Sequence, residues 1–271
     1  MDQTNMKGTP AEQKPLVKDE NGEPQQDTVN YASVVGMLLY LLGHTRTDLA
    51  YSISQVAHFM FNPKHSHKIA LKRICRYLIG TKDKGMIIKP TNTINIDAYP
   101  DADFAGLYCH EDNNDPVCIC SHTGYVITVA GCPIFWSSKL QTKTATSTME
   151  AEVIALGSCC RDLLPIIALV DKIGIAIGIK KQDNNEANSS TMHITIHVDN
   201  SGALILATTP PLQFTPPSKQ YAIKTIWFCK KIIQHKIKVA PIKIHLQLGD
   251  IFTKMPSQVT FEFLKNLLQG W

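Results

Sequence analysis

The chain has 271 residues, of which 44% are hydrophobic, enough to bury one substantial core or one core with a smaller helical satellite. Its formal net charge is +4, so any nucleic-acid contact must come from local basic patches rather than from a field of the whole molecule. Residues 1–20 are polar and charged, without the apolar core of a secretory signal, and no apolar run reaches membrane-spanning length. These features predict a soluble protein without a membrane partner.

The eight cysteines are scattered, several of them inside apolar stretches, and do not form the dense framework of a small secreted protein. Reduced thiols in an intracellular protein are the simplest interpretation. Cys118 and Cys120, with Cys109, His110 and His122 nearby, lack the paired spacing of a structural zinc site. We therefore expect buried or loop cysteines there and no metal ligands.

The segment 1–30 is mostly Lys, Glu, Asp, Gln, Gly and Pro. Because this composition offers too little apolar surface to offset its ordering entropy, it predicts a flexible linker. The segment 31–90 then carries three helical patterns, which predict a small helical subdomain. These helices are expected at Tyr31 to Leu42, Asp48 to Phe61 and Ser66 to Gly80.

The third of these helices carries a basic stripe, in which Lys68, Lys72 and Arg76 recur every four residues. A stripe of this kind is suited to following nucleic-acid phosphates. A solvated helix face is an equally good interpretation, because exposed Lys and Arg are ordinary surface residues. Both interpretations stay open at this point.

After Gly85 the pattern changes to short β-prone runs separated by turn-forming residues. Two or three consecutive antiparallel strands fit this spacing. The runs are Met86 to Lys89, Ile94 to Tyr99, Gly124 to Val129 and Pro133 to Ser137. A long helix follows from Thr148 to Ile173, and we expect a perturbation at Pro165, where the ring replaces a backbone donor.

The remainder of the chain alternates between strand and helix. Strands are expected at His193 to Val198 and Val239 to Leu246, helices at Ser201 to Ala207 and Ser218 to Gln234, and helical segments interrupted near Pro256 from Asp250 to Leu268. The whole order predicts an α/β fold over 91–271, with a mixed sheet flanked by helices.

Four carboxylates occupy the ends of these expected elements: Asp101, Glu150, Asp199 and Asp250. Asp101 follows the first core strand, Asp199 ends a later strand, and the other two lie where helices begin. In mixed α/β sheets such ends gather at one edge, so side chains distant in sequence can converge on one polar cleft. We expect the four to form one site.

Clustered carboxylates raise one another's pKa unless a bound cation neutralises them. Oxygen ligands that leave room for water and phosphate suit Mg²⁺, with Mn²⁺ as the alternative, and two such ions support phosphodiester hydrolysis. Taken singly, each acid is more often a helix cap or a partner of the helix dipole. The pattern alone therefore leaves metal-dependent phosphoryl chemistry as one option among several.

Several sequence blocks decide between these options. Asn30-Tyr-Ala-Ser-Val-Val-Gly-Met-Leu-Leu-Tyr-Leu, Asp101-Ala-Asp-Phe-Ala-Gly, Thr123-Gly-Tyr-Val-Ile, Trp136-Ser-Ser-Lys-Leu-Gln, Ser147-Thr-Met-Glu-Ala-Glu and Gln247-Leu-Gly-Asp-Ile-Phe-Thr-Lys resemble the C-terminal Pol region of copia-type retrotransposons. The blocks occur in the family's order from about residue 8 to Trp271. Together they are much more specific than any one of them.

The resemblance implies a ribonuclease H-like domain with a five-stranded mixed sheet, preceded by the segment that connects it to reverse transcriptase. Motif by motif it places the family's acids on Asp101, Glu150, Asp199 and Asp250. Asp103 and Glu152 are the nearest rivals, and if the strand continues, alternation would direct Asp103 to the same side as Asp101. The implied reaction is Mg²⁺-dependent cleavage of the RNA strand of an RNA–DNA hybrid.

The implied substrate can be recognised through its shape and 2′-hydroxyl groups without base specificity. Lys139, Lys143, Lys219 and Lys224 are candidate phosphate contacts, each weighed against an ordinary solvated lysine. The implied partner is a reverse transcriptase palm, whose paired aspartates this chain lacks, so we expect no polymerase activity. Cytoplasm is the expected compartment, with the nucleus as the alternative.

The chain departs from the family pattern between residues 217 and 229. Where the family commonly carries polar or basic residues, this chain has Pro217, Gln220, Thr225, Ile226 and Cys229. Losing that many hydrogen-bonding groups should weaken substrate contact or helix placement. A catalytically impaired remnant or hybrid-binding scaffold is therefore the alternative to a working enzyme, and a metal-dependent DNA nuclease is a third hypothesis.

Overall fold

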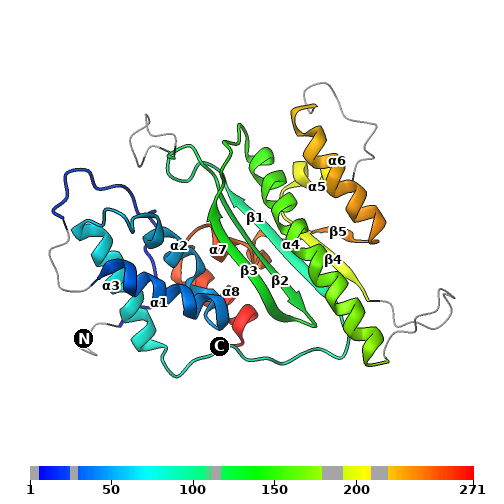
Figure 1. The fold of residues 1–271 in the computed structure, drawn as a ribbon, viewed down its shortest axis with the longest axis horizontal. Coiled ribbons are helices and arrows are strands. Elements are labelled where there is room, and N and C mark those ends of the chain that lie inside the picture. Colours follow the sequence, from blue (N-terminus) through cyan, green and yellow to red (C-terminus); the bar gives the residue numbers. More distant parts are fainter. Residues whose placement is uncertain (1–5, 25–29, 109, 111–116, 179–191, 209–218) are drawn as a thin grey trace.

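The computed structural model describes residues 6–24, 30–108, 110, 117–178, 192–208 and 219–271, and for 219–225 it describes the backbone alone. Its centre is a five-stranded sheet of order β3-β2-β1-β4-β5. β1 (Ile96–Asp103), β2 (His122–Val129) and β3 (Cys132–Leu140) are antiparallel, whereas β4 (Ile194–Val198) runs parallel to β1 and β5 (Lys238–Pro241) parallel to β4 (Figure 1). The predicted mixed α/β sheet is confirmed.

Two of the expected strands differ from the prediction. Residues 86–89 form no strand, although the backbone N–H of Ile87 donates to the carbonyl of Gln269 at 3.0 Å. The run predicted from 239 to 246 ends as a strand at Pro241 and continues as the short 3₁₀ helix η4 (Ile244–Leu246). Proline has no backbone N–H for the ladder, which accounts for the early end.

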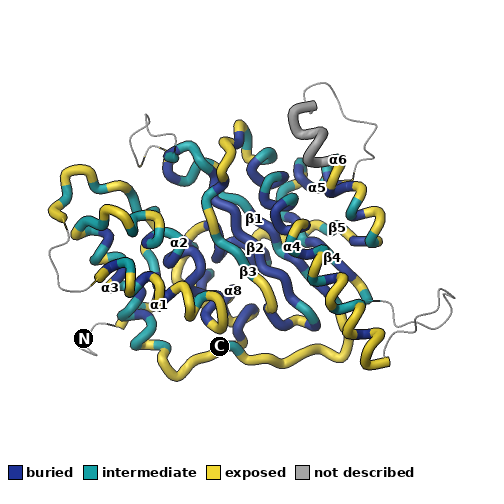
Figure 2. The backbone as a smooth tube through the Cα atoms, viewed as in Figure 1, coloured by how far each residue is buried: buried dark blue, intermediate teal, exposed yellow. Residues whose placement is uncertain are grey.

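One face of the sheet is covered by α4 (Thr148–Ala176), α5 (Ser201–Thr208) and α6 (Lys219–Gln234). Their buried side chains pack with those of β1, β2 and β4 into one hydrophobic cluster, to which α4 contributes Val153, Leu156 and Leu163. In Figure 2 the central strands β1, β2 and β4 and the inner side of α4 are largely buried, while exposed residues lie on the outer helix surfaces and on parts of β3 and β5. This arrangement is the two-layered packing expected for apolar faces of helix and sheet.

The helix α4 is 29 residues long and contains a stretch of mean hydropathy 1.9, enough by length and composition to cross a membrane. The expectation that no apolar run reaches that length is therefore wrong. In the structure 44% of this stretch is buried within the protein, and the helix continues through Pro165 from Thr148 to Ala176. Its apolar composition reflects its place over the central strands, where Cys159 and Leu163 are fully buried.

The other hydrophobic cluster joins the two ends of the chain. It contains residues of α1 (Tyr31–His44), α2 (Ala50–His58) and α3 (His65–Gly80), together with residues of α7 (Asp250–Thr253) and α8 (Gln258–Gln269). Figure 1 shows the red C-terminal helices beside the blue N-terminal ones, against the sheet. The three predicted N-terminal helices are present, but they share their core with the C-terminal segment.

The described part of the expected linker, residues 6–24, packs along α2 and α3. Arg73 donates to the carbonyl of Thr9 at 3.2 Å and pairs with Glu12 at 3.0 Å. His67 Nε2 donates to the carbonyl of Val17 at 3.0 Å. These hydrogen bonds tie backbone carbonyls of the segment to α3. The described segment therefore packs against the protein and differs from the predicted flexible linker.

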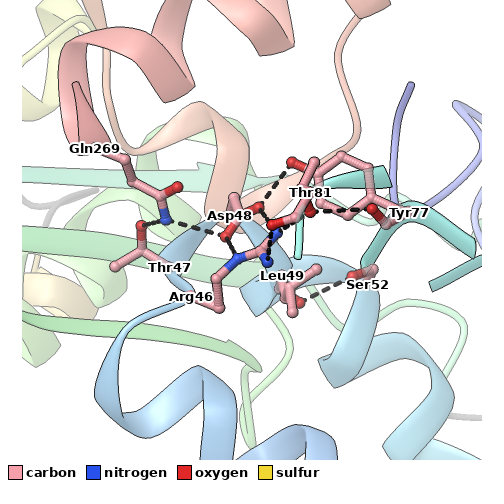
Figure 3. Close-up of polar contacts among 8 residues, drawn as sticks. All are labelled: Arg46, Thr47, Asp48, Leu49, Ser52, Tyr77, Thr81 and Gln269. Carbon is pink, nitrogen blue, oxygen red and sulfur yellow. Dashed lines mark hydrogen bonds and ion pairs between the residues drawn. The ribbon is translucent and has the colours of Figure 1, made fainter. Parts of the chain in front are cut away.

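A buried polar network ties α8 to the N-terminal helices (Figure 3). Arg46 forms a two-point ion pair with Asp48 at 2.9 and 2.7 Å, just before and within the 3₁₀ helix η2 (Thr47–Leu49). Tyr77 of α3 donates to the same carboxylate at 2.7 Å, and the Gln269 amide donates to it at 3.0 Å. Their side chains are almost fully buried, so these bonds provide the partners that a buried charge requires.

Candidate active site

Three carboxylates meet where β1, β4 and α4 come together. The side chains of Asp101, Glu152 and Asp199 place oxygen atoms within 4.8 Å of one another. β1 and β4 are parallel neighbours paired with a constant offset, Ile96 with Ile194 and Ala98 with Ile196. That offset of 98 (194 − 96) continues to Asp101 and Asp199, so strand register alone puts these two acids side by side.

Glu150 does not join this cluster. Its carboxylate accepts hydrogen bonds from the backbone N–H and the hydroxyl of Thr146, at 2.7 and 2.9 Å. Its own backbone N–H donates to the hydroxyl of Ser147 at 3.1 Å, so Glu150 helps to cap the start of α4. Glu152, the rival considered from the sequence, lies in the cluster instead.

The physical reason is helix phase, since each residue advances about 100° around an α-helix and two residues turn a side chain by about 200°. The sequence did contain a signal for this outcome. Ser147-Thr-Met-Glu150 has the Ser-x-x-Glu spacing of a capping box, which predicts that the first glutamate serves the helix end.

Asp250 lies beside Asp101, outside the group of three. It opens α7, and its Oδ1 lies 3.0 Å from Lys254 Nζ. Thr253, at the other end of the same short helix, donates a hydrogen bond from its hydroxyl to Asp101 Oδ2. The carboxylate of Asp250 also contributes to the raised pKa of Asp101, so the structure brings three of the four expected acids to one place.

The short helix α7 reaches the sheet because two glycines leave room for it. A Cβ on Gly249 would lie 2.6 Å from Asp101 Cβ and 2.8 Å from the carbonyl oxygen of Tyr99. A Cβ on Gly124 would lie 2.6 Å from that of Phe252. Both distances are shorter than real Cβ contacts, so α7 can lie this close to the sheet only because neither position has a side chain. This close packing holds Asp250 near Asp101.

Hydrogen bonds of Gln247 hold the loop that precedes α7 in place. Its amide donates to the carbonyl of Pro100 at 3.1 Å, and its Oε1 accepts from the backbone N–H of Gly249 at 3.2 Å. It also hydrogen-bonds Asp199 and thereby favours the charged form of that carboxylate. One buried glutamine therefore links the end of β1, the end of β4 and the start of α7.

Burial dominates the electrostatics of the cluster. Burial, with the neighbouring Asp250 charge, raises the pKa of Asp101 to about 6. Burial and the charges of Asp101 and Asp199 raise the pKa of Glu152 to about 9. The pKa of Asp199 is raised by the same two causes, burial first and then Asp101. In the absence of a cation the site therefore resists carrying its full negative charge.

These residues fit a hard divalent cation. All the grouped ligand atoms are carboxylate oxygens, which suits Mg²⁺ or Mn²⁺ better than softer metals. In addition, Asp250 Oδ1 is buried and receives no hydrogen bond of normal geometry. The neighbour of Asp250 Oδ1 is the ammonium group of Lys254, whose Nζ lies 3.0 Å away in an ion pair. A bound divalent cation would relieve the mutual repulsion of the clustered carboxylates.

Two of the four predicted phosphate contacts line a groove of about 580 Å³ between the ends of β2 and β3 and the outer side of α4. Lys139 and Lys143 lie there, together with Arg161, Gln141 and the partly exposed Trp227. The side chains of Lys219 and Lys224 lie outside the described residues. Arg161 and Trp227 are not recognisable from the sequence as groove residues, because only the tertiary structure brings α4 and α6 to the same groove.

The segment that departs from the family pattern is described only in part. Pro217 and the side chains of Gln220 and Thr225 lie outside the described residues. Ile226 is half-buried, and Cys229 is buried, with its thiol donating to the carbonyl of Leu206 at 3.5 Å. Where they are described, the apolar replacements therefore pack toward the protein interior.

Comparison with known proteins gives relatives along nearly the whole chain, although no family model matches. The chain is 32% identical over 254 residues to the retrovirus-related Pol polyprotein from transposon RE2 of Arabidopsis thaliana, which covers 94% of this chain and 16% of that protein. It is 28% identical over the same length to the retrovirus-related Pol polyprotein from transposon TNT 1-94 of Nicotiana tabacum, and this match covers 94% of this chain and 17% of that protein. The chain thus spans about one-sixth of these relatives' length.

A shorter relative and two solved structures are also similar. The secreted RxLR effector protein 161 of Plasmopara viticola is 34% identical over 134 residues, 49% of this chain and 89% of that protein. LC11-RNase H1 isolated from compost is 16% identical with a TM-score of 0.37, covering 56% of this chain and 86% of that one. The prototype foamy virus protease-reverse transcriptase is 12% identical with a TM-score of 0.35, and the match covers 62% of this chain and 21% of that one.

The strand order, with three antiparallel strands followed by two parallel ones and acids at the β1 and β4 ends, defines a ribonuclease H-like domain. The predicted fold class is thereby confirmed. Similarity to RE2 and TNT 1-94 over 94% of the chain identifies the particular lineage. The chain belongs to the Pol polyprotein family of copia-type retrotransposons, as its sequence blocks predicted.

Proposed function

We propose that this chain is the ribonuclease H part of a retrotransposon Pol polyprotein and hydrolyses the RNA strand of an RNA–DNA hybrid with Mg²⁺, or Mn²⁺ in its place. The observation that carries the proposal is the convergence of Asp101, Glu152 and Asp199, with Asp250 adjacent, in a member of that family. The proposed ligand set therefore replaces Glu150, expected from the sequence, by Glu152.

The position of each residue indicates whether it would hold the metal ions or orient a ligand. Asp101 projects from within β1, two residues before its end, Asp199 follows directly after β4, and Glu152 completes the set from α4. The Thr253 hydroxyl orients Asp101, and Gln247 orients Asp199. When bound, a pair of divalent cations would lower the pKa of the attacking water and stabilise the leaving oxygen. The carboxylates are held in place before the substrate arrives, which reduces the reorganisation needed for reaction.

The groove along α4 is the proposed binding surface for the hybrid. Lys139, Lys143 and Arg161 offer cations, and Trp227 offers an aromatic face, without a carboxylate among the described residues that line the groove. Arg161 follows Glu152 by nine residues on the same helix, roughly 13 Å along its axis at 1.5 Å per residue. Those nine residues also make about two and a half helical turns, so Arg161 projects from the side of α4 opposite to Glu152. A groove lined by cations suits phosphate contacts, which position the duplex without reading bases.

A cleavage assay with matched variants tests the proposal. We expect the wild-type protein to cut the RNA of a labelled hybrid in Mg²⁺, and Asp101→Asn or Glu152→Gln to reduce the rate by a factor on the order of 10² or more. Glu150→Gln is the matched control, two residues away on the same helix, and should keep nearly the wild-type rate. Equal loss in both glutamate variants would contradict the proposed ligand set.

The same assay separates the competing functions. Binding of the hybrid without turnover, measured by fluorescence anisotropy, would identify a non-catalytic scaffold, the alternative that the apolar residues Ile226 and Cys229 favour. Cleavage of duplex DNA as fast as the hybrid would identify a general nuclease.

Because the relatives are Pol polyproteins, we infer a reverse transcriptase palm as partner and the cytoplasm, or else the nucleus, as the compartment.

A further inference from the structure

Lys254, the last residue of the block Gln247-Leu-Gly-Asp-Ile-Phe-Thr-Lys, lies against the acid cluster although it was not among the candidate site residues. Its Nζ is 3.0 Å from Asp250 Oδ1, four residues earlier, and it follows directly after Thr253, whose hydroxyl binds Asp101. Its backbone N–H donates to the carbonyl of Asp250 at 3.1 Å and so fixes the start of the side chain at the end of α7. The ammonium group is thus directed toward the carboxylates by two anchored neighbours.

The charge of Lys254 acts on every carboxyl group at this place. It opposes the raised pKa of five acids, which are Asp101, Asp103, Glu152, Asp199 and Asp250. Burial alone would lower the pKa of Lys254, but the charges of Asp101 and Asp250 raise it overall, so the side chain stays protonated. A single lysine therefore offsets part of the repulsion within the cluster.

The side chain of Lys254 can also leave. It is 47% exposed, whereas that of Asp250 is 9% exposed. A divalent cation on Asp250 Oδ1 would lie within a few ångströms of the ammonium group, and like charges at that distance repel strongly in a partly buried site. The lysine can escape into solvent by rotating its flexible stem, but the carboxylate cannot.

We propose that Lys254 is a built-in counter-ion of the acid cluster, which stabilises the metal-free protein and must leave Asp250 before a divalent cation can bind there. The inference rests on the metal site proposed above. It assigns Lys254 a positioning role that sets the affinity of the site for the cation, because each binding event has to displace a favourable ion pair.

Titration of the protein with Mn²⁺ alone, followed by electron paramagnetic resonance of the free ion, tests this role. We expect Lys254→Met to bind Mn²⁺ about tenfold more tightly than wild type, which corresponds to about 1.4 kcal/mol. Lys254→Arg keeps the charge and should stay near the wild-type affinity. Lys243→Met is the matched control, since this exposed lysine belongs to the same C-terminal segment and is removed with the same change in net charge.

Melting temperature in a chelator provides a readout that needs no metal. Lys254→Met should melt several degrees below wild type near pH 8, and adding Asp250→Asn to it should recover most of that loss, because the variant then lacks both charges. The double variant also keeps the test valid if the single one folds poorly. Lys243→Met should melt like the wild type.

The outcomes separate the two proposals. If wild type binds Mn²⁺ and Lys254→Met binds it with the same affinity, the counter-ion role is overturned while the metal site stands. If wild type binds no Mn²⁺ at millimolar concentration, the proposed metal-dependent function is overturned. An unchanged melting temperature of Lys254→Met in chelator would also overturn the counter-ion role, whatever the result with Mn²⁺.

Discussion

At the residue scale, the acid cluster places a cost on the metal-free protein. Asp101 and Glu152 are buried, and each is surrounded by other carboxyl groups. Folding therefore favours their protonated forms, whereas in the unfolded chain both groups titrate near their ordinary values. A site arranged to bind a cation is destabilising when that cation is missing, which is a common trade between function and stability.

This arrangement makes stability depend on pH with a definite sign. The pKa of Asp101 is raised to about 6 and that of Glu152 to about 9. Between about pH 4 and those values the folded state holds protons that the unfolded state has released, so the stabilisation is complete at low pH and is lost as pH rises. We expect the melting temperature in chelator to fall between about pH 5 and pH 9 from this cause.

Glu152→Gln isolates that contribution, because its amide cannot ionise. The variant should show a flatter decline over the same pH range, and near pH 9 it should be more stable than wild type without metal. Differential scanning fluorimetry in a series of buffers measures the curves, and saturating Mg²⁺ should bring the wild-type curve closer to that of the variant. If the melting temperatures of the two proteins fell equally with pH, the raised pKa of Glu152 would be contradicted.

At the scale of elements, the site depends on how closely α7 approaches β1. The space between Gly249 and the strand has no room for a methyl group, since a Cβ would lie 2.6 Å from Asp101 Cβ. Neither contacting atom is the flexible end of a side chain, because the other neighbour is the backbone carbonyl of Tyr99 at 2.8 Å. The helix must move if a side chain is added, and Asp250, Thr253 and Lys254 move with it.

Gly249→Ala tests the dependence of the site on this approach. We expect a loss of about 1–3 kcal/mol in the free energy of unfolding from overpacking, and a loss of hybrid cleavage of about tenfold or more because Asp250 is displaced. Urea denaturation and the cleavage assay measure the two effects. Gly36→Ala is a fair control, because nothing lies within 4 Å of a Cβ at that position.

At the scale of the whole molecule, the two ends of the chain form one core. Side chains from 31–77 and 248–268 pack together, and Gln269 donates to both Thr47 and Asp48 across more than two hundred residues of sequence. Because α7 carries Asp250 and belongs to this core, the N-terminal helices support the site through α7. The ribonuclease H-like sheet and the preceding helices are expected to unfold together.

Asp48→Ala tests that connection at its centre. The substitution leaves Arg46 buried without its carboxylate and removes acceptors from Tyr77 and Gln269, so we expect a loss of about 3–5 kcal/mol in the free energy of unfolding. Chemical denaturation followed by both circular dichroism and tryptophan fluorescence measures it. Two separate transitions, with only one shifted, would contradict a shared core.

The amino-acid sequence by itself determined the family, the order of the elements and the positions of Asp199 and Asp250 at element ends, because these depend on local periodicity and on motifs. The strand expected to end before Asp101 continues to Asp103, so Asp101 lies inside β1. Only the tertiary structure shows that Glu152, and not Glu150, lies beside Asp101 and Asp199, since the position of each glutamate depends on helix phase relative to the sheet and on the hydrogen bond of Glu150 to Thr146. It also revealed Lys254 and the shared core of the two chain ends. Those features arise from contacts between distant segments, which a local pattern does not encode.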